Sequence, residues 1–318
     1  MKSDYIWMDG ELIPFEEATV HFLSPSIHYG FGAFEGIRCY ATPGGPGIFR
    51  LPEHLQRFID SIKIIGIRDY DYSIEDLREA VHTTIQVNKL SGCYIRPAVY
   101  VEGPLVLNSD QYETKTGIAV WEWGTYLGEG ALEKGVRMAV SSFTRLHPNV
   151  HMTKAKAAGN YVNSIMASTL AHRYGFEDAI MLDPEGYVAE GSGMNIFVVR
   201  NGIIYTPYRA TVLEGITRDS VITLARDLGY TLVEEPIVRD QLYIADEVFV
   251  CGTAAEVTAV TEIDTRKIGS GLMGPVTRNV QQEFFKTVKG EGKRSGAWLD
   301  YVPEQSPDVV SDKSPALV

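Results

Sequence analysis

A lysine surrounded by small residues is the first feature of this sequence that could carry out covalent chemistry. Lys154 and Lys156 lie in the stretch 153–161 among alanines and a glycine, and Tyr161 follows five residues after Lys156. A lysine with little around it to solvate its charge can lose its proton near neutral pH, and the neutral amine can then form a Schiff base with an aldehyde. Spacing alone favours solvated surface lysines, so the stretch needs support from elsewhere.

Further motifs follow in a definite order along the chain. They are HYGFGAFEGIRCY at 28–40, YIRP at 94–97, KAAGNY at 156–161, EGSG at 190–193 leading into NIF at 195–197, GITR at 215–218, and GTAAE at 252–256. This ordered set resembles the signature of the branched-chain amino acid aminotransferases, which are fold-type-IV enzymes that use pyridoxal 5'-phosphate. Several motifs in the right order are more specific than any one of them, and the match extends across nearly the whole chain.

The resemblance implies an α+β fold of two domains, similar to D-amino acid aminotransferase. A small α/β sandwich domain would be followed by a larger domain built on a pseudo-barrel sheet. The length of 318 residues also favours two domains. We expect the small domain at 1–124, an interdomain loop at 125–135, the large cofactor-binding domain at 136–302, and a disordered Pro/Ser/Asp-rich tail at 303–318.

Local patterns predict the elements of the first domain. Residues 5–8 and 11–14 form a hairpin signal around an Asp-Gly turn, and 33–40 with 48–50 form a second one across a Pro/Gly-rich turn at 43–47. Apolar residues at helical spacing predict a helix over 52–65. Ser73 with Asp76 is typical of a capping box, which would start a helix running to about 88. Residues 94–101 and 116–123 are predicted strands.

The second domain is predicted to begin with a strand over 137–142. One apolar face of the next helix, which ends around 174–175, would consist of Val162, Ile165, Met166, Thr169 and Leu170. A meander of strands at 179–182, 187–190, 195–199 and 203–206 should form a sheet under the cofactor. Thr217 is expected to cap a helix through 228, and the remaining elements are a helix near 239–245, a strand at 247–251 and a final helix over 274–289.

The resemblance assigns the catalytic roles to three residues. Lys156, by its position in the motif, is implied to attach the cofactor covalently and to move the substrate's α-proton, whereas Lys154 is interpreted as a solvated neighbour. Glu190 is implied to keep the cofactor's ring nitrogen protonated, which makes the ring a better electron sink. Tyr161 is implied to hydrogen-bond the cofactor's phenolic oxygen. Outside the motif, Glu190 would be interpreted as a solvated strand-end residue and Tyr161 as half-buried core.

The cofactor phosphate needs several hydrogen-bond donors, which the N-terminus of a helix supplies through its N–H groups and its dipole. Ile216 and Thr217, directly after Gly215, open such a helix, and Thr217 can also act as a plain N-cap. The resemblance adds Arg57 and Thr253 to the phosphate site. Without it, Arg57 would be interpreted as a surface arginine.

A branched aliphatic substrate requires an apolar pocket, while its α-carboxylate requires donors. The resemblance implies both kinds of pocket residue: Tyr29, Phe34, Trp123 and Tyr126 as walls, and Tyr94, Arg96, Thr253 and Ala254 on the polar side. The polar side would also admit glutamate and 2-oxo acids. The implied activity is reversible ping-pong transfer of the amino group from L-leucine, L-isoleucine or L-valine to 2-oxoglutarate.

Two departures from the family pattern bear on substrate breadth. Met194 stands where a glutamate is usual, and Trp121-Glu122-Trp123 stands where a more apolar approach to the pocket is common. The nearest alternative is another fold-type-IV enzyme, such as a D-amino acid or (R)-amine aminotransferase or aminodeoxychorismate lyase, and the FEGIR run at 34–38 argues against it.

Two more distant alternatives belong to other classes of protein. The glycines at 30, 32 and 36 resemble a loose dinucleotide fingerprint, but no helix follows them, which disfavours a dehydrogenase. A catalytically silent relative with a binding or structural role is disfavoured by the intact Lys156 and Glu190.

Bulk properties exclude other classes of function. The net charge of −12 disfavours a nucleic-acid partner, and neither a signal peptide nor a membrane span is evident. Three distant cysteines, Cys39, Cys93 and Cys251, fit reduced thiols in a cytoplasm. His147 and His151 have ligand-like spacing, but Pro148 lies between them, so no metal site is predicted. By resemblance we expect a homodimer or a larger homo-oligomer.

Overall fold

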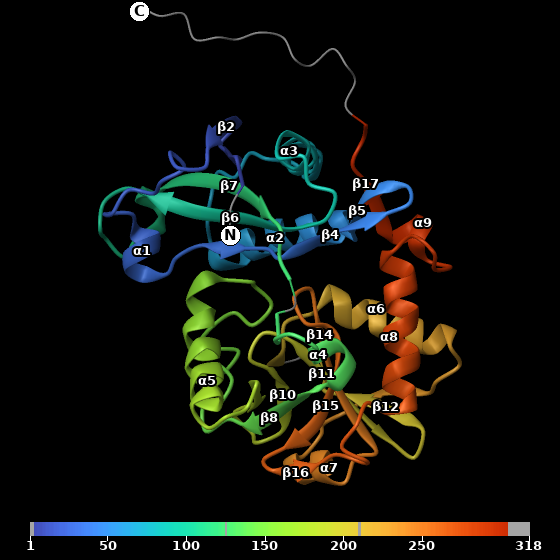
Figure 1. Cartoon of the computed structure of the whole chain (residues 1–318). Helices are drawn as coiled ribbons and strands as arrows, with labels where there is room; N and C mark the ends of the chain where they lie inside the picture. The colour runs from blue at the N-terminus through green and yellow to red at the C-terminus, as the bar shows by residue number, and fades with distance from the viewer. Residues whose placement is uncertain (1–2, 125, 209–210, 305–318) are drawn as a thin grey trace, which may run out of the picture.

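Two β-sheets, each with its own helices, make up the computed structural model, which describes residues 3–124, 126–208 and 211–304 (Figure 1). Most of the first sheet comes from the N-terminal part of the chain, and the second sheet comes from residues 136–267. The predicted α+β fold with a small sandwich and a larger, half-barrel sheet is confirmed. The predicted domain boundaries stay a prediction.

The first sheet contains eight strands in the order β17-β5-β4-β6-β7-β1-β2, with β3 paired to β6. Its strands are β1 (Tyr5–Met8), β2 (Glu11–Pro14), β3 (Ala33–Phe34), β4 (Ile37–Thr42), β5 (Gly45–Phe49), β6 (Cys93–Glu102), β7 (Glu113–Trp121) and β17 (Leu299–Tyr301). Both predicted hairpins are present. At the first of them Asp9 and Gly10 have φ of 47° and 98°, as a type I′ turn requires.

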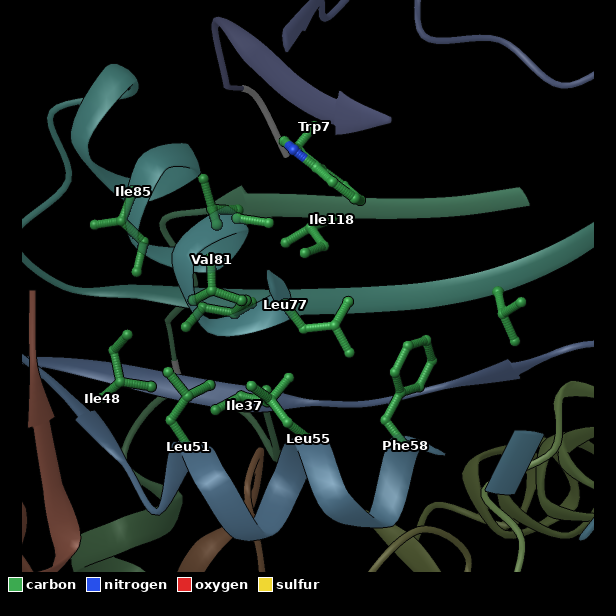
Figure 2. Close-up of a cluster of buried hydrophobic side chains, with 14 of the residues drawn as sticks. Trp7, Ile37, Ile48, Leu51, Leu55, Phe58, Leu77, Val81, Ile85 and Ile118 are labelled. Atoms are coloured by element: carbon green, nitrogen blue, oxygen red, sulfur yellow. The ribbon is translucent and has the colours of Figure 1, made fainter. Parts of the chain in front are cut away.

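Two long helices cover this sheet, α2 (Leu51–Ile65) and α3 (Ile74–Val87), while the short α1 (Pro25–Tyr29) packs on β6. Ser73 and Asp76 form the predicted capping box at the start of α3. Apolar side chains of α2 and α3 meet those of the strands in one buried cluster (Figure 2). This cluster fixes the position of α2, which carries Arg57.

The second sheet contains nine strands in the order β10-β9-β8-β15-β14-β11-β12-β13, with β16 paired to β15. They are β8 (Val136–Val140), β9 (Asp178–Leu182), β10 (Val188–Gly191), β11 (Asn195–Arg200), β12 (Ile203–Thr206), β13 (Leu232–Glu234), β14 (Glu247–Gly252), β15 (Glu256–Ile263) and β16 (Arg266–Lys267). The predicted simple meander is wrong, because β8, β15 and β14 lie between β9 and β11. The central strand β15 was not predicted.

Helices flank the second sheet on both sides (Figure 1). Helix α5 (Tyr161–Arg173) packs on β9, whereas α6 (Ile216–Asp227) and α8 (Pro275–Val288) pack on β14 and on one another. The shorter helices are α4 (Ala131–Lys134), α7 (Arg239–Tyr243) and α9 (Ser295–Trp298), and the 3-10 turns are η1 (Ser109–Gln111) and η2 (Ala158–Asn160). No helix in the described ranges is long and apolar enough to cross a membrane.

The apolar face that the spacing predicts on α5 is largely exposed. Val162 and Ile165 are each 61% exposed and Met166 is 45% exposed, while the buried residues of the helix are Ser164, Ala167 and Ala171. Small side chains let α5 approach β9 closely, which leaves the larger apolar side chains on the outside. A single copy of the chain therefore presents an uncovered apolar stripe along α5.

The C-terminal segment also differs from the prediction. The helix expected over 274–289 is α8, but it is followed by α9 and by β17, which pairs with β5 in the first sheet. The chain therefore returns to the first sheet near its end. Of the predicted disordered tail at 303–318, residues 305–318 lie outside the described residues. The predicted loop at 125–135 contains α4, and residue 125 lies outside the described residues as well.

Candidate active site

A cavity of about 270 Å³ lies between elements of the two sheets, near the lower end of the size range of small-molecule sites. Most of the residues predicted for the site line it: Phe34, Arg57, Tyr94, Arg96, Trp123, Tyr126, Lys156, Tyr161, Glu190, Ile216, Thr217, Thr253 and Ala254. Tyr29 is the exception, because it lies on α1, is 44% exposed and is not among the described residues that line the cavity. Its predicted place in the pocket wall stays a prediction.

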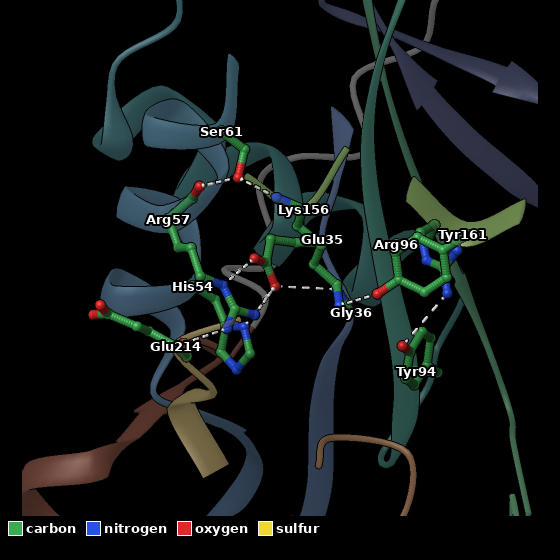
Figure 3. Close-up of polar contacts among 10 residues, drawn as sticks. All are labelled: Glu35, Gly36, His54, Arg57, Ser61, Tyr94, Arg96, Lys156, Tyr161 and Glu214. Carbon is green, nitrogen blue, oxygen red and sulfur yellow. Dashed lines mark hydrogen bonds and ion pairs between the residues drawn. The ribbon is translucent and has the colours of Figure 1, made fainter. Parts of the chain in front are cut away.

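Lys156 is held in the cavity through both its backbone and its side chain. Its backbone N–H donates to Ser61 Oγ on α2 at 2.9 Å (Figure 3). Its carbonyl accepts from the Phe34 N–H on β3 at 3.1 Å. Its Nζ donates to Tyr161 Oη at 2.7 Å. The amine is therefore fixed between elements of the first sheet's layer and the start of α5.

Glu190 lies at the end of β10, buried with 4% exposure. Arg145 Nε donates to Glu190 Oε1 at 2.6 Å, and Asn195 Nδ2 donates to Oε2 at 3.3 Å. A buried carboxylate requires such partners because desolvation penalises its charge. This pairing gives Glu190 a fixed orientation on the cavity wall.

Arg57 reaches the cavity from α2 and is anchored behind by a fully buried carboxylate. Its Nε and Nη2 donate to Glu35 Oε1 and Oε2 at 2.6 and 2.8 Å, and His54 Nδ1 lies 2.8 Å from Oε2 (Figure 3). Burial by itself would raise the pKa of Glu35, but the charge of Arg57 and the contacts with His54 hold it well below its usual range. Burial lowers the pKa of His54, so a neutral ring donates its Nδ1–H to the carboxylate.

The N-terminus of α6 lines the same cavity. Gly215 is the N-cap, with extended backbone, and Ile216 and Thr217 are the first two helical residues. The predicted capping role of Thr217 is therefore wrong, because the residue lies inside the helix. A Cβ at Gly215 would lie 2.0 Å from Asn195 Oδ1, so this close approach requires glycine at the cap.

Aromatic rings form one side of the cavity. Phe34 and Tyr161 have ring centroids 4.8 Å apart, and Trp123 contacts both Tyr94 and Tyr126, with centroids 4.4 and 5.8 Å away. Arg96 lies over the Phe34 ring at 4.5 Å. The site thus combines apolar walls with a cation beside them. Trp121 packs behind Tyr94 and is not among the described lining residues.

We expect Gly36→Ala to destabilise the protein by about 1–3 kcal/mol through overpacking. A Cβ at Gly36 would lie 2.0 Å from Tyr94 Oη and 2.9 Å from its Cζ, and Tyr94 is buried against Trp121 and Trp123. Urea denaturation measures the change. Gly296→Ala is the matched control, since nothing lies within 4 Å of its Cβ position. Equal stability of the two variants would contradict this packing.

Lys154 differs from its predicted role as a solvated neighbour. Its Nζ donates to the Val212 carbonyl at 3.1 Å and lies 3.3 Å from Glu214 Oε1, and its side chain is 37% exposed. Met194, the departure from the family pattern, is 4% exposed and packs with the apolar cluster under the second sheet while also lining the cavity. The position usually occupied by a glutamate therefore faces an apolar layer.

Several residues of the site were not found from the sequence. Arg145, Glu35 and Ser61 each hold a predicted residue in place, and His54 in turn holds Glu35. Each of these contacts spans at least 19 positions. Local spacing carries no signal for such contacts. Glu35 lies inside the FEGIR motif, and that was the one available indication of its importance.

Comparison with known proteins gives consistent matches. Residues 32–263 match the family model described as amino-transferase class IV. The chain is 48% identical, over 95% of its length and 98% of the relative, to the branched-chain-amino-acid aminotransferase of Pseudomonas aeruginosa. Two solved branched-chain amino acid aminotransferases each match 95% of this chain. The structure from Escherichia coli is covered completely, with a TM-score of 0.93 and 44% identity. The structure from Thermobaculum terrenum in its PLP form is covered to 99%, with a TM-score of 0.88 and 34% identity. The chain belongs to the class IV aminotransferases and, within them, to the branched-chain-amino-acid aminotransferases.

Proposed function

We propose that this protein transfers the amino group of L-leucine, L-isoleucine and L-valine to 2-oxoglutarate, reversibly and with pyridoxal 5'-phosphate as cofactor. The observation that carries the proposal is the cavity in which the Lys156 amine meets the Tyr161 hydroxyl, with the buried Glu190 on the same lining. The relative that is 48% identical is a branched-chain-amino-acid aminotransferase. Another solved relative contains pyridoxamine 5'-phosphate.

The donor set of the cavity fits this cofactor. Arg57 and the first N–H groups of α6, at Ile216 and Thr217, suit a phosphate dianion, and we assign Thr253 to the same group. We assign Glu190 to the ring nitrogen and Tyr161 to the phenolic oxygen. Lys156 supplies the primary amine that this aldehyde needs.

When bound, pyridoxal 5'-phosphate supplies the aldehyde and an electron-accepting ring. The residues supply position and proton transfer. Tyr161 orients the Lys156 amine through the 2.7 Å hydrogen bond. The Lys156 Nζ would take the proton from the substrate's α-carbon and would return it to the carbon of the cofactor's aldehyde group. Glu190, which Arg145 holds in place, would keep a proton at the ring nitrogen.

The substrate side of the cavity combines a cation with aromatic walls. Arg96 Nε is buried and has no hydrogen-bond partner within the described residues, and a substrate carboxylate would satisfy it. The backbone N–H groups of Thr253 and Ala254, in the turn between β14 and β15, add donors. Phe34, Trp123 and Tyr126 would receive the branched side chain.

A transamination assay with several amino donors tests the function. With 2-oxoglutarate as acceptor, we expect glutamate formation from L-leucine to exceed that from D-alanine and from (R)-1-phenylethylamine by at least an order of magnitude. Faster reaction with D-alanine or the amine would assign the chain to another fold-type-IV activity. If the protein takes up no cofactor and remains colourless, the proposed enzyme activity is wrong.

We also propose that the protein works as a homodimer or larger homo-oligomer in the cytoplasm. A second copy would cover the apolar side chains exposed on α5 and near α1, among them Val162, Ile165, Phe22 and Ile27. It would also give the exposed Tyr29 a place against a neighbouring chain. Sedimentation equilibrium that gives the mass of a single chain would contradict this assembly. The three cysteines are free and buried, which suits a reducing compartment.

A further inference from the structure

Three consecutive carbonyl groups in the loop before α6 are each bound by a side chain from a different part of the chain. Lys154 Nζ donates to Val212 O at 3.1 Å, Asn195 Nδ2 to Leu213 O at 3.2 Å, and Arg57 Nη1 to Glu214 O at 2.9 Å. These three contacts hold the loop 212–214 by consecutive peptide groups. The residue that follows the loop is Gly215, the N-cap of α6.

Lys154 contacts the loop at two points through its ammonium group. The same Nζ that donates to Val212 O lies 3.3 Å from Glu214 Oε1. A charge-assisted hydrogen bond is stronger than a neutral one, and the side chain is only 37% exposed. Lys154 is not among the described residues that line the cavity, so its effect on the site passes through the loop.

The loop determines where the first N–H groups of α6 lie. Backbone groups at a helix N-terminus bind a phosphate only when they converge on it, and their position follows that of the preceding residues. Lys154 also lies two residues before Lys156, in the turn that precedes it. One short segment therefore contains both Lys156, whose amine would attach the cofactor, and Lys154, which binds the loop that leads to the phosphate site.

We propose that Lys154 is a positioning residue for the cofactor phosphate. It holds the loop 212–214 so that the N–H groups at the start of α6 converge on the phosphate, while its neighbour Lys156 holds the other end of the cofactor. This inference rests on the proposed use of pyridoxal 5'-phosphate. The lysine that the sequence pattern marks as an incidental neighbour thus sets cofactor affinity.

The test compares Lys154→Met, which keeps the apolar stem and removes the ammonium group, with Lys154→Arg, which keeps the charge. Titration of the apoprotein with pyridoxal 5'-phosphate gives the dissociation constant. We expect Lys154→Met to bind about 5- to 20-fold more weakly and Lys154→Arg to stay within about 3-fold of the wild type. Lys267→Met, on the exposed strand β16, is the matched control and should bind as the wild type does.

Hydrogen exchange of the apoprotein provides a readout that needs no cofactor. In Lys154→Met the backbone amides of residues 213–217 should exchange faster, whereas those of α3 should be unchanged. Unchanged affinity in Lys154→Met, or exchange that accelerates equally throughout the protein, would overturn the positioning role. If the wild type itself fails to bind the cofactor, the proposed function fails instead, and the exchange comparison still decides whether Lys154 holds the loop.

Discussion

Replacing Lys156 by alanine should abolish amino transfer, with kcat reduced at least about a thousandfold. In the proposed function the lysine provides both the covalent anchor of the cofactor and the group that moves the α-proton, and a methyl side chain can do neither. In the cavity its Nζ bonds Tyr161 Oη, and its ammonium group lies about 5 Å from the centroids of the Phe34 and Tyr161 rings. None of these contacts can be replaced by another amine from the cavity lining, where the other cations are the arginines Arg57, Arg96 and Arg145.

The measurement has two parts. Steady-state transamination of L-leucine gives kcat, and borohydride reduction followed by peptide mass spectrometry shows which residue carries the cofactor. The wild type should be labelled at Lys156 and the alanine variant should not. Lys267→Met is again the control and should keep full activity. Activity of Lys156→Ala above about a tenth of the wild-type value would exclude Lys156 as the essential amine.

Elements with strong local signals were predicted well from the sequence. The capping box at Ser73 and the Asp9-Gly10 turn depend on a few neighbouring residues, so local residue types determine them. Lys156, Tyr161 and Glu190 were predicted as site residues for a different reason. Their motifs occur in the order that the family shows, and the fold brings these separated segments to one cavity.

Local sequence patterns were not sufficient to predict elements whose structure depends on burial or packing. Strand β15 is buried on both faces for most of its length, so it lacks the alternation that marks a half-buried strand. On α5 the periodicity was real, but the pattern does not say which face meets the sheet. The small residues Ala167 and Ala171 pack inward, and the larger apolar side chains remain outside.

Contacts between distant residues account for the other differences. Lys154 was interpreted as a surface residue from its neighbours in the sequence. Its partner Glu214 lies 60 positions away, so local sequence does not reveal the interaction. Arg145 lies outside the motifs quoted for the family, although it holds Glu190. Tyr29 follows the family motif but lies outside the cavity of its own chain. The motifs therefore indicated candidate site residues, whereas only the fold shows which other residues hold them in position.

The second large effect expected is on stability, from Glu35→Gln. Glu35 is fully buried and accepts hydrogen bonds from Arg57, His54 and the Gly36 N–H. An amide has nearly the same shape, but it turns an –NH₂ group toward these donors and leaves the Arg57 charge without its counter-ion. Breaking a buried ion pair on one side is strongly destabilising, so we expect the free energy of unfolding at pH 7.5 to fall by about 3 kcal/mol.

The pH dependence of that loss identifies its cause. Because the folded pKa of Glu35 lies well below its ordinary value of 4.5, the ionised carboxylate stabilises the fold fully above about pH 4.5, and this contribution is lost as the pH falls through the folded pKa. The difference between wild type and Glu35→Gln should therefore be constant between pH 8 and 5 and should narrow below pH 4.5. Urea denaturation of the apoproteins at pH 7.5, 5.5 and 3.5 measures it, with Glu79→Gln on the exposed face of α3 as the control. A difference that stays the same at pH 3.5 would mean that shape, and not the charge of Glu35, holds Arg57 in the site.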